Sequence, residues 1–123
     1  MKLAPGTIVW VDLDPTRGRE QRGVRPCVVV SSAEVAAQQR YPLVCVVPIT
    51  GTPGEGAIYP RLAPGPSGLR KRSFALVDQL RSIDKTRGRR VFGVVSPREL
   101  EAVDLGLRLH LGMEDTSPAR PAP

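Results

Sequence analysis

Two apolar stretches decide the fold: RPCVVV at residues 25–30 and LVCVVPIT at residues 43–50. Both are short and rich in β-branched side chains, which is the pattern of buried β-strands. Arg25 opens the first stretch and Thr50 closes the second. Because a guanidinium and a hydroxyl at the ends of two such strands can converge on one phosphate, we predict a site between them. A structural arginine and an ordinary strand-end threonine are the alternatives.

The segment that leads to Arg25 supports this prediction. Residues 14–23 are polar and include Gly18 and Gly23, as expected of a surface loop with an adaptable backbone. A polar loop, an arginine and a threonine together indicate a binding site.

Three further segments have the pattern of strands, and together they predict a mainly β fold. Residues 7–13 are apolar at odd and even positions alike, so we expect this strand to be covered on both faces. Residues 73–84 alternate imperfectly, which indicates a strand with a bulge or a strong bend. Residues 85–90 form a basic turn, and residues 91–95 are the last strand.

The connection at residues 51–73 is rich in proline and glycine. We expect a long loop that is mobile without a partner and contains a short strand near residues 57–59. It ends in the basic cluster Arg70, Lys71 and Arg72.

Short helices complete the expected architecture. Ser32 can cap one or two helical turns that reach residue 39. The motif SPRE at residues 96–99 combines a serine cap, a proline at the first helical position and a glutamate that closes a capping box. A longer helix therefore begins there and ends near Gly112.

This C-terminal helix carries two apolar stripes. The first is Leu100, Val103, Leu107 and Leu111, and the second is Ala102, Leu105 and Leu109. One stripe would pack on the sheet. The other would pack on a second subunit or be buried within the same core.

Length and charge indicate one basic domain. The 123 residues predict a domain at residues 1–112 and a disordered, proline-rich tail at residues 113–123. Residues 1–95 hold fifteen Lys and Arg against seven Asp and Glu, and most of the cationic side chains are arginines. Arginine binds phosphate through a planar fork of donors, so we expect an anionic partner, with nucleic acid first. An arginine-rich proteome is the alternative origin of this charge.

Cysteine usage and hydropathy predict a cytoplasmic protein. Cys27 and Cys45 lie in apolar strand stretches, where we expect buried packing roles. The sequence shows neither an apolar leader nor a stretch long enough to cross a bilayer, so we expect no membrane association.

Composition excludes several chemistries. His110 is the only histidine, which rules out a two-histidine ribonuclease and leaves an ordinary helical side chain. No cluster of His, Cys, Asp and Glu resembles a metal site, and no glycine-rich loop has the lysine and helix that bind nucleotide phosphates. We therefore expect neither a metal nor a cofactor.

Arginine chemistry at a phosphate is the remaining possibility. Attack of a 2′-hydroxyl on the adjacent phosphorus needs no metal if a fixed arginine stabilises the added negative charge. Thr50 would position a phosphate oxygen or the attacking hydroxyl. Because arginine is a poor acid or base, Glu20 in the preceding loop is the candidate to assist.

Four blocks of the chain resemble those of MazF/PemK-type toxins. They are GTIVWVDLDP at residues 6–15, GREQRGVRP at 18–26, PIT at 48–50 and DQLRSID at 78–84. The resemblance extends from Gly6 to about Gly112. It implies an SH3-like small β-barrel of the PemK/CcdB type with a C-terminal α-helix, and a homodimer. It also implies metal-independent cleavage of single-stranded RNA to a 2′,3′-cyclic phosphate, and neutralisation by a cognate antitoxin.

The resemblance further implies roles for individual residues. Arg25 and Thr50 fall on its catalytic positions, and Glu20 is the third catalytic candidate. The RNA-binding residues that we expect are Arg17, Arg19, Gln21, Gln79 and Arg81. Alternatively, Gln79 and Arg81 are simply the exposed face of a strand.

Two other functions remain compatible with the sequence. One is a non-enzymatic toxin on the same barrel that inhibits a topoisomerase, as CcdB-like relatives do. The other is a catalytically silent module that binds nucleic acid or an antitoxin. The combination of Arg25, Thr50 and a loop glutamate favours the enzyme, because a protein-binding surface needs none of them.

Overall fold

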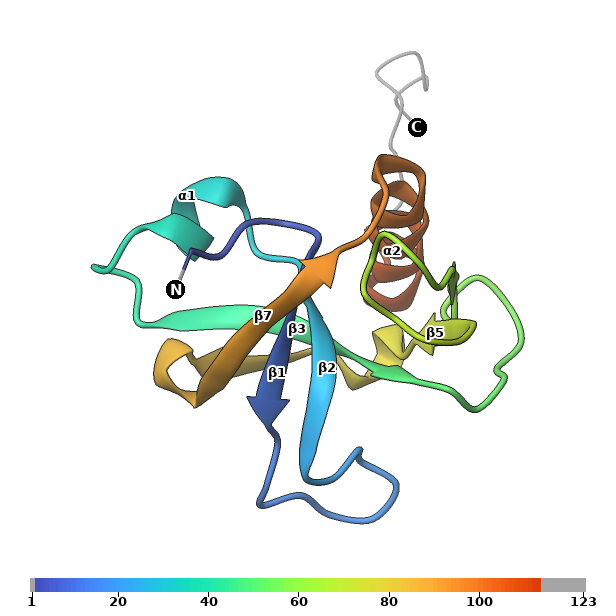
Figure 1. Cartoon of the computed structure of the whole chain (residues 1–123), viewed down its shortest axis with the longest axis horizontal. Helices are drawn as coiled ribbons and strands as arrows, with labels where there is room; N and C mark the ends of the chain where they lie inside the picture. Colours follow the sequence, from blue (N-terminus) through green and yellow to red (C-terminus); the bar gives the residue numbers. More distant parts are fainter. Residues whose placement is uncertain (1, 114–123) are drawn as a thin grey trace, which may run out of the picture.

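The chain folds into a curled antiparallel half-barrel with a long C-terminal helix against it (Figure 1). This computed structural model describes residues 2–113. The strand order is β4-β5-β3-β2-β1-β7, and β6 pairs with β3 beside that path. The strands are β1 Thr7–Asp12, β2 Val24–Val29, β3 Leu43–Thr50, β4 Arg61–Leu62, β5 Ser73–Ala75, β6 Arg81–Asp84 and β7 Gly88–Val94. The predicted fold class, mainly β with a C-terminal helix, is confirmed.

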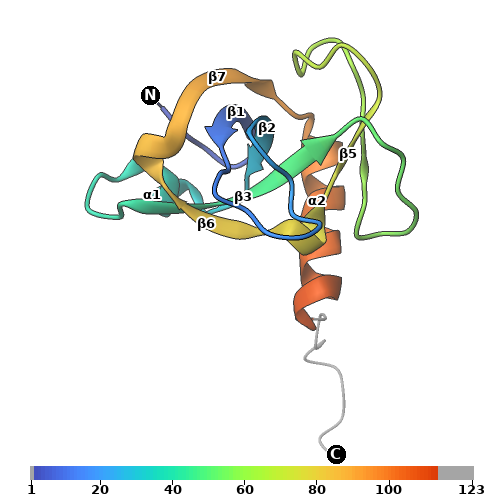
Figure 2. The ribbon, with the colours of Figure 1, turned by 90° about the horizontal axis from the view of Figure 1, so that it is seen from below.

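Strand β3 is the centre of the sheet. It pairs with β2 through Val46–Pro48, with β6 through Leu43–Val46 and with β5 through Ile49–Thr50. Strand β1 joins β2 to β7. Seen from below, these strands curl around an interior and do not form a flat sheet (Figure 2).

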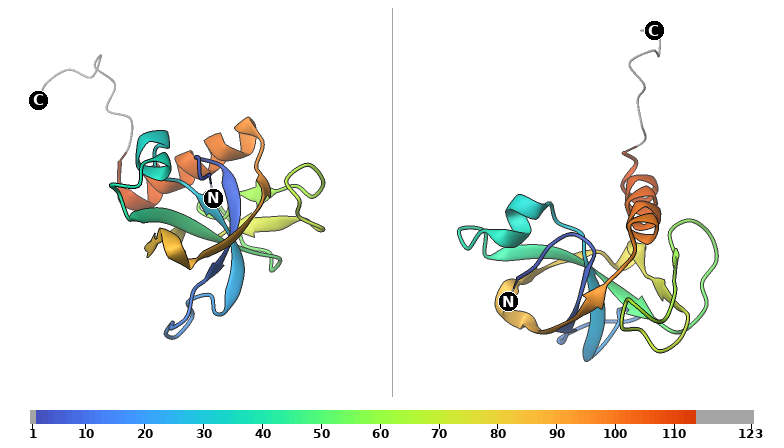
Figure 3. Two further views of the ribbon diagram at one scale, coloured as in Figure 1. Left: turned by 60° about the vertical axis from the view of Figure 1, so that its left-hand side comes forward. Right: turned by 45° about the horizontal axis from the view of Figure 1, so that its top comes forward.

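Both faces of the central strands are buried, which explains their continuous apolar sequences. On one face, Val9 and Val29 pack with Ala36 of α1, Ala33–Ala37. On the other face, Ile8 and Val28 pack with Val103 of α2, Pro97–Leu111. The two helices lie apart on the sheet (Figure 3). The expectation that the first strand is covered on both faces is confirmed.

The segment at residues 73–84 bends as its imperfect alternation predicts. Strands β5 and β6 both pair with β3, and a 3-10 turn of 3 residues, η1 at Val77–Gln79, separates them. The turn removes Asp78 and Gln79 from the ladder. Their side chains are therefore free to serve a site.

Two boundaries differ from those predicted. The short strand expected near residues 57–59 is wrong, because β4 forms at Arg61–Leu62 and a turn precedes it. This turn packs under α2 so closely that a Cβ on Gly106 would lie 2.7 Å from the carbonyl oxygen of Ala57. The basic turn expected at residues 85–90 is only the 3-10 turn η2, Lys85–Arg87, after which β7 begins.

Helix α2 begins and ends where its sequence signals predict. Ser96 and Glu99 form the capping box, and Gly112 ends the helix with φ at 71°. Val103 is buried, whereas Leu105 and Leu109 are 55% and 44% exposed. Burial of the second stripe within the same core is therefore wrong. Leu111 of the first stripe is also exposed, because it lies in the last turn, past the sheet.

Glu99 also connects α2 to the long loop. Its Oε1 accepts from the backbone N–H of Ser96, and its Oε2 accepts from that of Ala63. Beyond Met113, the expected disordered tail lies outside the described residues. Within residues 2–113, no helix combines the length and the hydropathy that a membrane span requires.

Candidate functional site

A groove of about 480 Å³ contains both Arg25 and Thr50, and we call it the Arg25–Thr50 groove. The pairing of β2 with β3 explains their proximity. The paired stretch ends with Cys27 opposite Pro48, and Arg25 and Thr50 each lie two residues beyond this pair, at the same end of the two strands. The groove is lined by Trp10, Arg25, Pro26, Ile49, Thr50, Gly51, Leu69, Arg70, Lys71, Ser73, Arg90 and Phe92.

Arg25 and Thr50 both retain hydrogen-bonding capacity. The Nε of Arg25 donates to the carbonyl oxygen of Arg22 at 3.0 Å, which orients the exposed guanidinium. Its two terminal nitrogens have no partner among the described residues. The hydroxyl of Thr50 accepts from the backbone N–H of Thr52 at 3.1 Å, so its own proton can be donated to a ligand.

The groove is strongly cationic. Four of its lining side chains carry positive charge, namely Arg25, Arg70, Lys71 and Arg90, and no carboxylate of residues 2–113 lines it. The ion pairs among residues 2–113 are Arg40 with Glu34 and Arg89 with Asp12, so none of the four is neutralised there. Such a surface concentrates anions.

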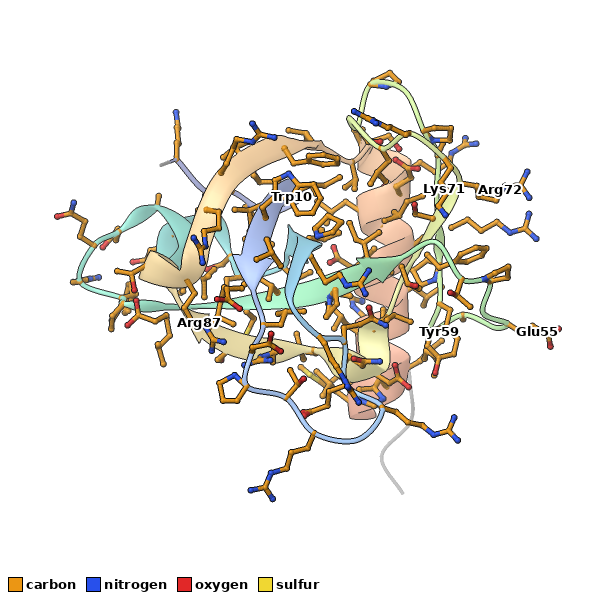
Figure 4. All side chains as sticks on the ribbon, turned by 60° about the horizontal axis from the view of Figure 1, so that its bottom comes forward. Trp10, Glu55, Tyr59, Lys71, Arg72 and Arg87 are labelled. Atoms are coloured by element: carbon orange, nitrogen blue, oxygen red, sulfur yellow. The ribbon has the colours of Figure 1, made fainter. Side chains whose placement is uncertain are left out.

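An aromatic pair forms one wall of the groove. Trp10 and Phe92 meet edge to face, with ring centroids 5.1 Å apart. The indole Nε1 of Trp10 is buried and has no hydrogen-bond partner in the described part of the chain. A buried donor of this kind usually has a hydrogen-bond partner. Trp10 lies near the middle of the molecule in Figure 4.

The remaining predicted residues gather in a second pocket of about 320 Å³. Glu20, Gln21, Gln79 and Arg81 line it, together with Leu13, Pro15, Pro48, Asp78 and Leu80. Strand β3 contributes Pro48 to this pocket and Ile49 and Thr50 to the groove, so the two are adjacent along one strand. Arg17 and Arg19 are exposed on the loop, and they line neither the second pocket nor the Arg25–Thr50 groove.

Gln79 and Arg81 hold the loop between β1 and β2. The Oε1 of Gln79 accepts from the backbone N–H of Gln21 at 2.8 Å, and its Nε2 donates to the carbonyl oxygen of Arg19 at 3.4 Å. Arg81 donates from Nη1 to the carbonyl oxygen of Leu13 at 2.9 Å. Both side chains are half-buried, so the interpretation as a simple exposed strand face is wrong.

Glu20 is also tied to its own loop. Its Oε1 accepts from the backbone N–H of Arg17, and its own N–H donates to the carbonyl oxygen of Arg17 at 3.1 Å. The carboxylate therefore belongs to the second pocket and lies outside the groove that contains Arg25 and Thr50.

The structure adds residues to which the sequence assigned no role. Asp78 lines the second pocket, and the hydroxyl of Tyr59 donates to its Oδ2 at 2.6 Å. This hydrogen bond raises the pKa of Tyr59. The sequence shows Trp10 as an aromatic residue in a strand and Lys71 as part of a basic cluster. Nothing in the sequence indicates that both line the groove with Thr50.

The two cysteines differ in environment. Cys27 is fully buried, and this burial raises the pKa of its thiol to about 12. Its packing role is confirmed. Cys45 is only half-buried, with its Sγ 3.4 Å from the hydroxyl of Ser82, so full burial was wrong for this residue. Within residues 2–113, no group of three or more His, Cys, Asp and Glu could hold a metal ion.

Comparison with known proteins agrees with the geometry. The family model described as "PemK-like, MazF-like toxin of type II toxin-antitoxin system" matches residues 4–111. Endoribonuclease MazF9 of Mycobacterium tuberculosis is 38% identical over 114 residues, which cover 88% of this chain and 95% of that protein. Endoribonuclease toxin MazF of Escherichia coli K12 is 34% identical over 108 residues, which cover 87% of this chain and 92% of that protein.

A solved structure shows the same fold. MazF from Deinococcus radiodurans superimposes with a TM-score of 0.78 at 27% identity, covering 92% of this chain and 99% of that one. A mycobacterial endoribonuclease in complex with its cognate antitoxin gives a TM-score of 0.73 at 20% identity. The match covers 90% of this chain and 96% of that one.

Proposed function

The chain belongs to the PemK-like, MazF-like family of toxins of type II toxin-antitoxin systems, and we propose that it cleaves single-stranded RNA in the Arg25–Thr50 groove. It is an endoribonuclease toxin. The observation that supports this location of the active site is a cationic groove, with no carboxylate among its described lining residues, which Arg25 of β2 and Thr50 of β3 both line.

In this proposal, the ribose 2′-hydroxyl attacks the adjacent phosphorus. The five-coordinate phosphorane carries additional negative charge, which the terminal nitrogens of Arg25 stabilise. Thr50 donates its hydroxyl proton to a phosphate oxygen. The products are a 2′,3′-cyclic phosphate and a 5′-hydroxyl, and the residues themselves provide the stabilisation that a metal ion would provide in other nucleases.

The loop between β1 and β2 binds the flanking nucleotides. Arg17, Arg19 and Gln21 contact RNA from this loop, while Gln79 and Arg81 hold its backbone in place and border the path of the strand. Glu20 assists catalysis only after its carboxylate has left the N–H of Arg17.

The partners follow from the family and from the exposed surfaces. An antitoxin neutralises the enzyme, and an acidic, extended segment of it would compete with RNA for the cationic groove. A homodimer would cover Leu105 and Leu109 of α2. Residues 1–112 form the toxin domain, and an mRNA substrate places its action in the cytoplasm.

Replacement of Arg25 tests the placement of the active site. We expect Arg25→Ala to reduce kcat/KM on a long single-stranded RNA in EDTA by about 10²–10³-fold, because one preformed charge donor is lost. Arg25→Lys should also cleave RNA more slowly than wild type, since an ammonium cannot present the same fork of donors.

The matched control is Arg40→Ala, which removes an exposed arginine that pairs with Glu34. This variant should cleave at the wild-type rate. Wild-type cleavage by Arg25→Ala would contradict the proposed groove. Absence of cleavage by the wild-type protein on every RNA would favour the silent binding module.

A further inference from the structure

Lys71 lies beside Gly51, the residue that follows Thr50, although it is far away in sequence. Strand β5 pairs with the end of β3, so that Phe74 lies opposite Thr50 and Ala75 opposite Ile49. The residues that precede β5 therefore continue alongside Gly51. A Cβ placed on Gly51 would lie 2.7 Å from the Nζ of Lys71. The ammonium thus lies against the backbone that follows Thr50, in the space that a side chain at position 51 would fill.

A hydrogen bond anchors the backbone of Lys71, and its charge is not neutralised. The buried Ser73 donates its hydroxyl to the carbonyl oxygen of Lys71 at 3.0 Å. Lys71 has no carboxylate partner among residues 2–113. Figure 4 shows the neighbouring Arg72 extending outward, and Arg72 does not line the groove.

The reaction requires a proton donor that the predicted residues do not supply. When the bond from phosphorus to O5′ breaks, the departing alkoxide must receive a proton. A guanidinium does not give up its proton in proteins, so Arg25 cannot donate it. Glu20 lies in the second pocket, bound to the N–H of Arg17. Within the described part of the chain, no carboxylate and no histidine lines the groove.

An ammonium can give up a proton and remain as a stable neutral amine, and among residues 2–113 Lys71 is the only lysine that lines the groove. We propose that Lys71 is the general acid of the cleavage reaction. The 2′-oxygen bonds to phosphorus and releases its proton to water. As the bond to O5′ breaks, a proton passes from Nζ of Lys71 to O5′, and the neutral amine then recovers a proton from solvent. This inference rests on the proposed RNA cleavage.

A sulfur leaving group tests this role. We compare two RNAs of one sequence, which differ only in whether oxygen or sulfur occupies the 5′-bridging position of the scissile linkage. A thiolate departs without protonation, so the sulfur substrate needs no general acid. We expect Lys71→Ala to cleave the oxygen substrate about 10²–10³-fold more slowly than wild type. On the sulfur substrate, it should cleave within about tenfold of wild type.

Two further variants separate proton transfer from charge. Lys71→Arg keeps the positive charge but cannot supply the proton, so it should be slow on oxygen and normal on sulfur. Arg25→Ala should remain slow on both substrates, because its loss affects the phosphorane itself. The matched control Arg72→Ala removes the adjacent cation outside the groove and should cleave both substrates at wild-type rates.

The outcomes distinguish this inference from the proposed function. If wild type does not cleave the oxygen substrate, the proposed function fails. If Lys71→Ala cleaves the oxygen substrate as fast as wild type does, Lys71 is not the general acid. The same conclusion holds if this variant loses as much activity on the sulfur substrate as on the oxygen substrate. A fully active Lys71→Arg variant would show that charge alone suffices and would also overturn the inference. Lys71 is exposed, so circular dichroism should show that its variants keep the wild-type fold.

Discussion

Single residues determine the shape and chemistry of the groove. Gly51 is one of them, because it has no side chain. Gly51 leaves the space into which Lys71 extends, as Gly106 leaves the space for the turn under α2. Neither contact is visible in the sequence, because each glycine meets a residue far away along the chain. The sequence does predict Arg25 and Thr50, since each lies at the end of a recognisable strand.

Cys27 provides a test of burial at the residue scale. In the unfolded chain its thiol has the ordinary pKa of 9.0, whereas burial raises the pKa to about 12 in the fold, with a smaller opposing effect of Arg81. Above pH 9 the unfolded state therefore loses its proton first. The free energy of unfolding should fall as the pH rises from 9 to 12, and this thiol has no effect below about pH 9.

The measurement is urea unfolding between pH 7 and pH 10.5 for wild type and Cys27→Ala. We expect the wild-type free energy of unfolding to fall more steeply above pH 9, by up to about 1.4 kcal/mol per pH unit. Other groups titrate in this range, so the difference between the two slopes is the readout. Equal slopes would mean that the Cys27 thiol is accessible to solvent.

At the scale of elements, the sequence correctly predicted those boundaries that depend on neighbouring residues. The capping box and Gly112 fixed both ends of α2, and the imperfect alternation of residues 73–84 indicated the bend at η1. The position of β4 was missed because helix packing, a long-range contact, makes residues 57–59 a turn. The register of β5 against β3, which brings Lys71 close to Gly51, has no local signal either.

Gly106→Ala tests the contact between α2 and the turn beneath it. At an exposed helical position this change would stabilise the helix by up to about 1 kcal/mol. Here the new Cβ would lie 2.7 Å from the Ala57 carbonyl oxygen and 3.2 Å from Cγ2 of Val77. We therefore expect a loss of about 1–3 kcal/mol in the free energy of unfolding by urea.

His110→Ala in the same helix is the control, because His110 is exposed. Its effect should stay within about 0.5 kcal/mol. A stabilising Gly106→Ala would show that the turn moves away from α2 at little cost.

At the scale of the whole molecule, the fold brings cations from distant parts of the chain into one groove. The excess of Lys and Arg within residues 1–95 predicted an anionic partner, but it could not locate the binding surface. The fold brings Arg25 of β2, Arg90 of β7 and two cations of the long loop to a single groove. Composition therefore predicts an anionic partner, and the sheet topology forms the groove in which we propose that this partner binds.

Salt dependence tests this concentration of charge. Four phosphate contacts on a single strand predict that log kcat/KM falls with log salt concentration with a slope of roughly −3. Arg70→Ala should reduce the magnitude of that slope by about 0.7, because one counterion fewer is released. Arg40→Ala, outside the groove, should leave it unchanged. A slope near zero for wild type would contradict binding of RNA through these cations.

The pairing of β1 with β7 joins Thr7 to Val94, nearly the full length of the folded domain. During synthesis, a nascent chain that already contains β1 to β6 still lacks Arg90 and Phe92, which β7 contributes to the groove. Such distant pairings also form slowly, in milliseconds to seconds for small β domains. If the groove is the active site, as we propose, a growing chain therefore stays inactive until β7 has been synthesised and has paired with β1.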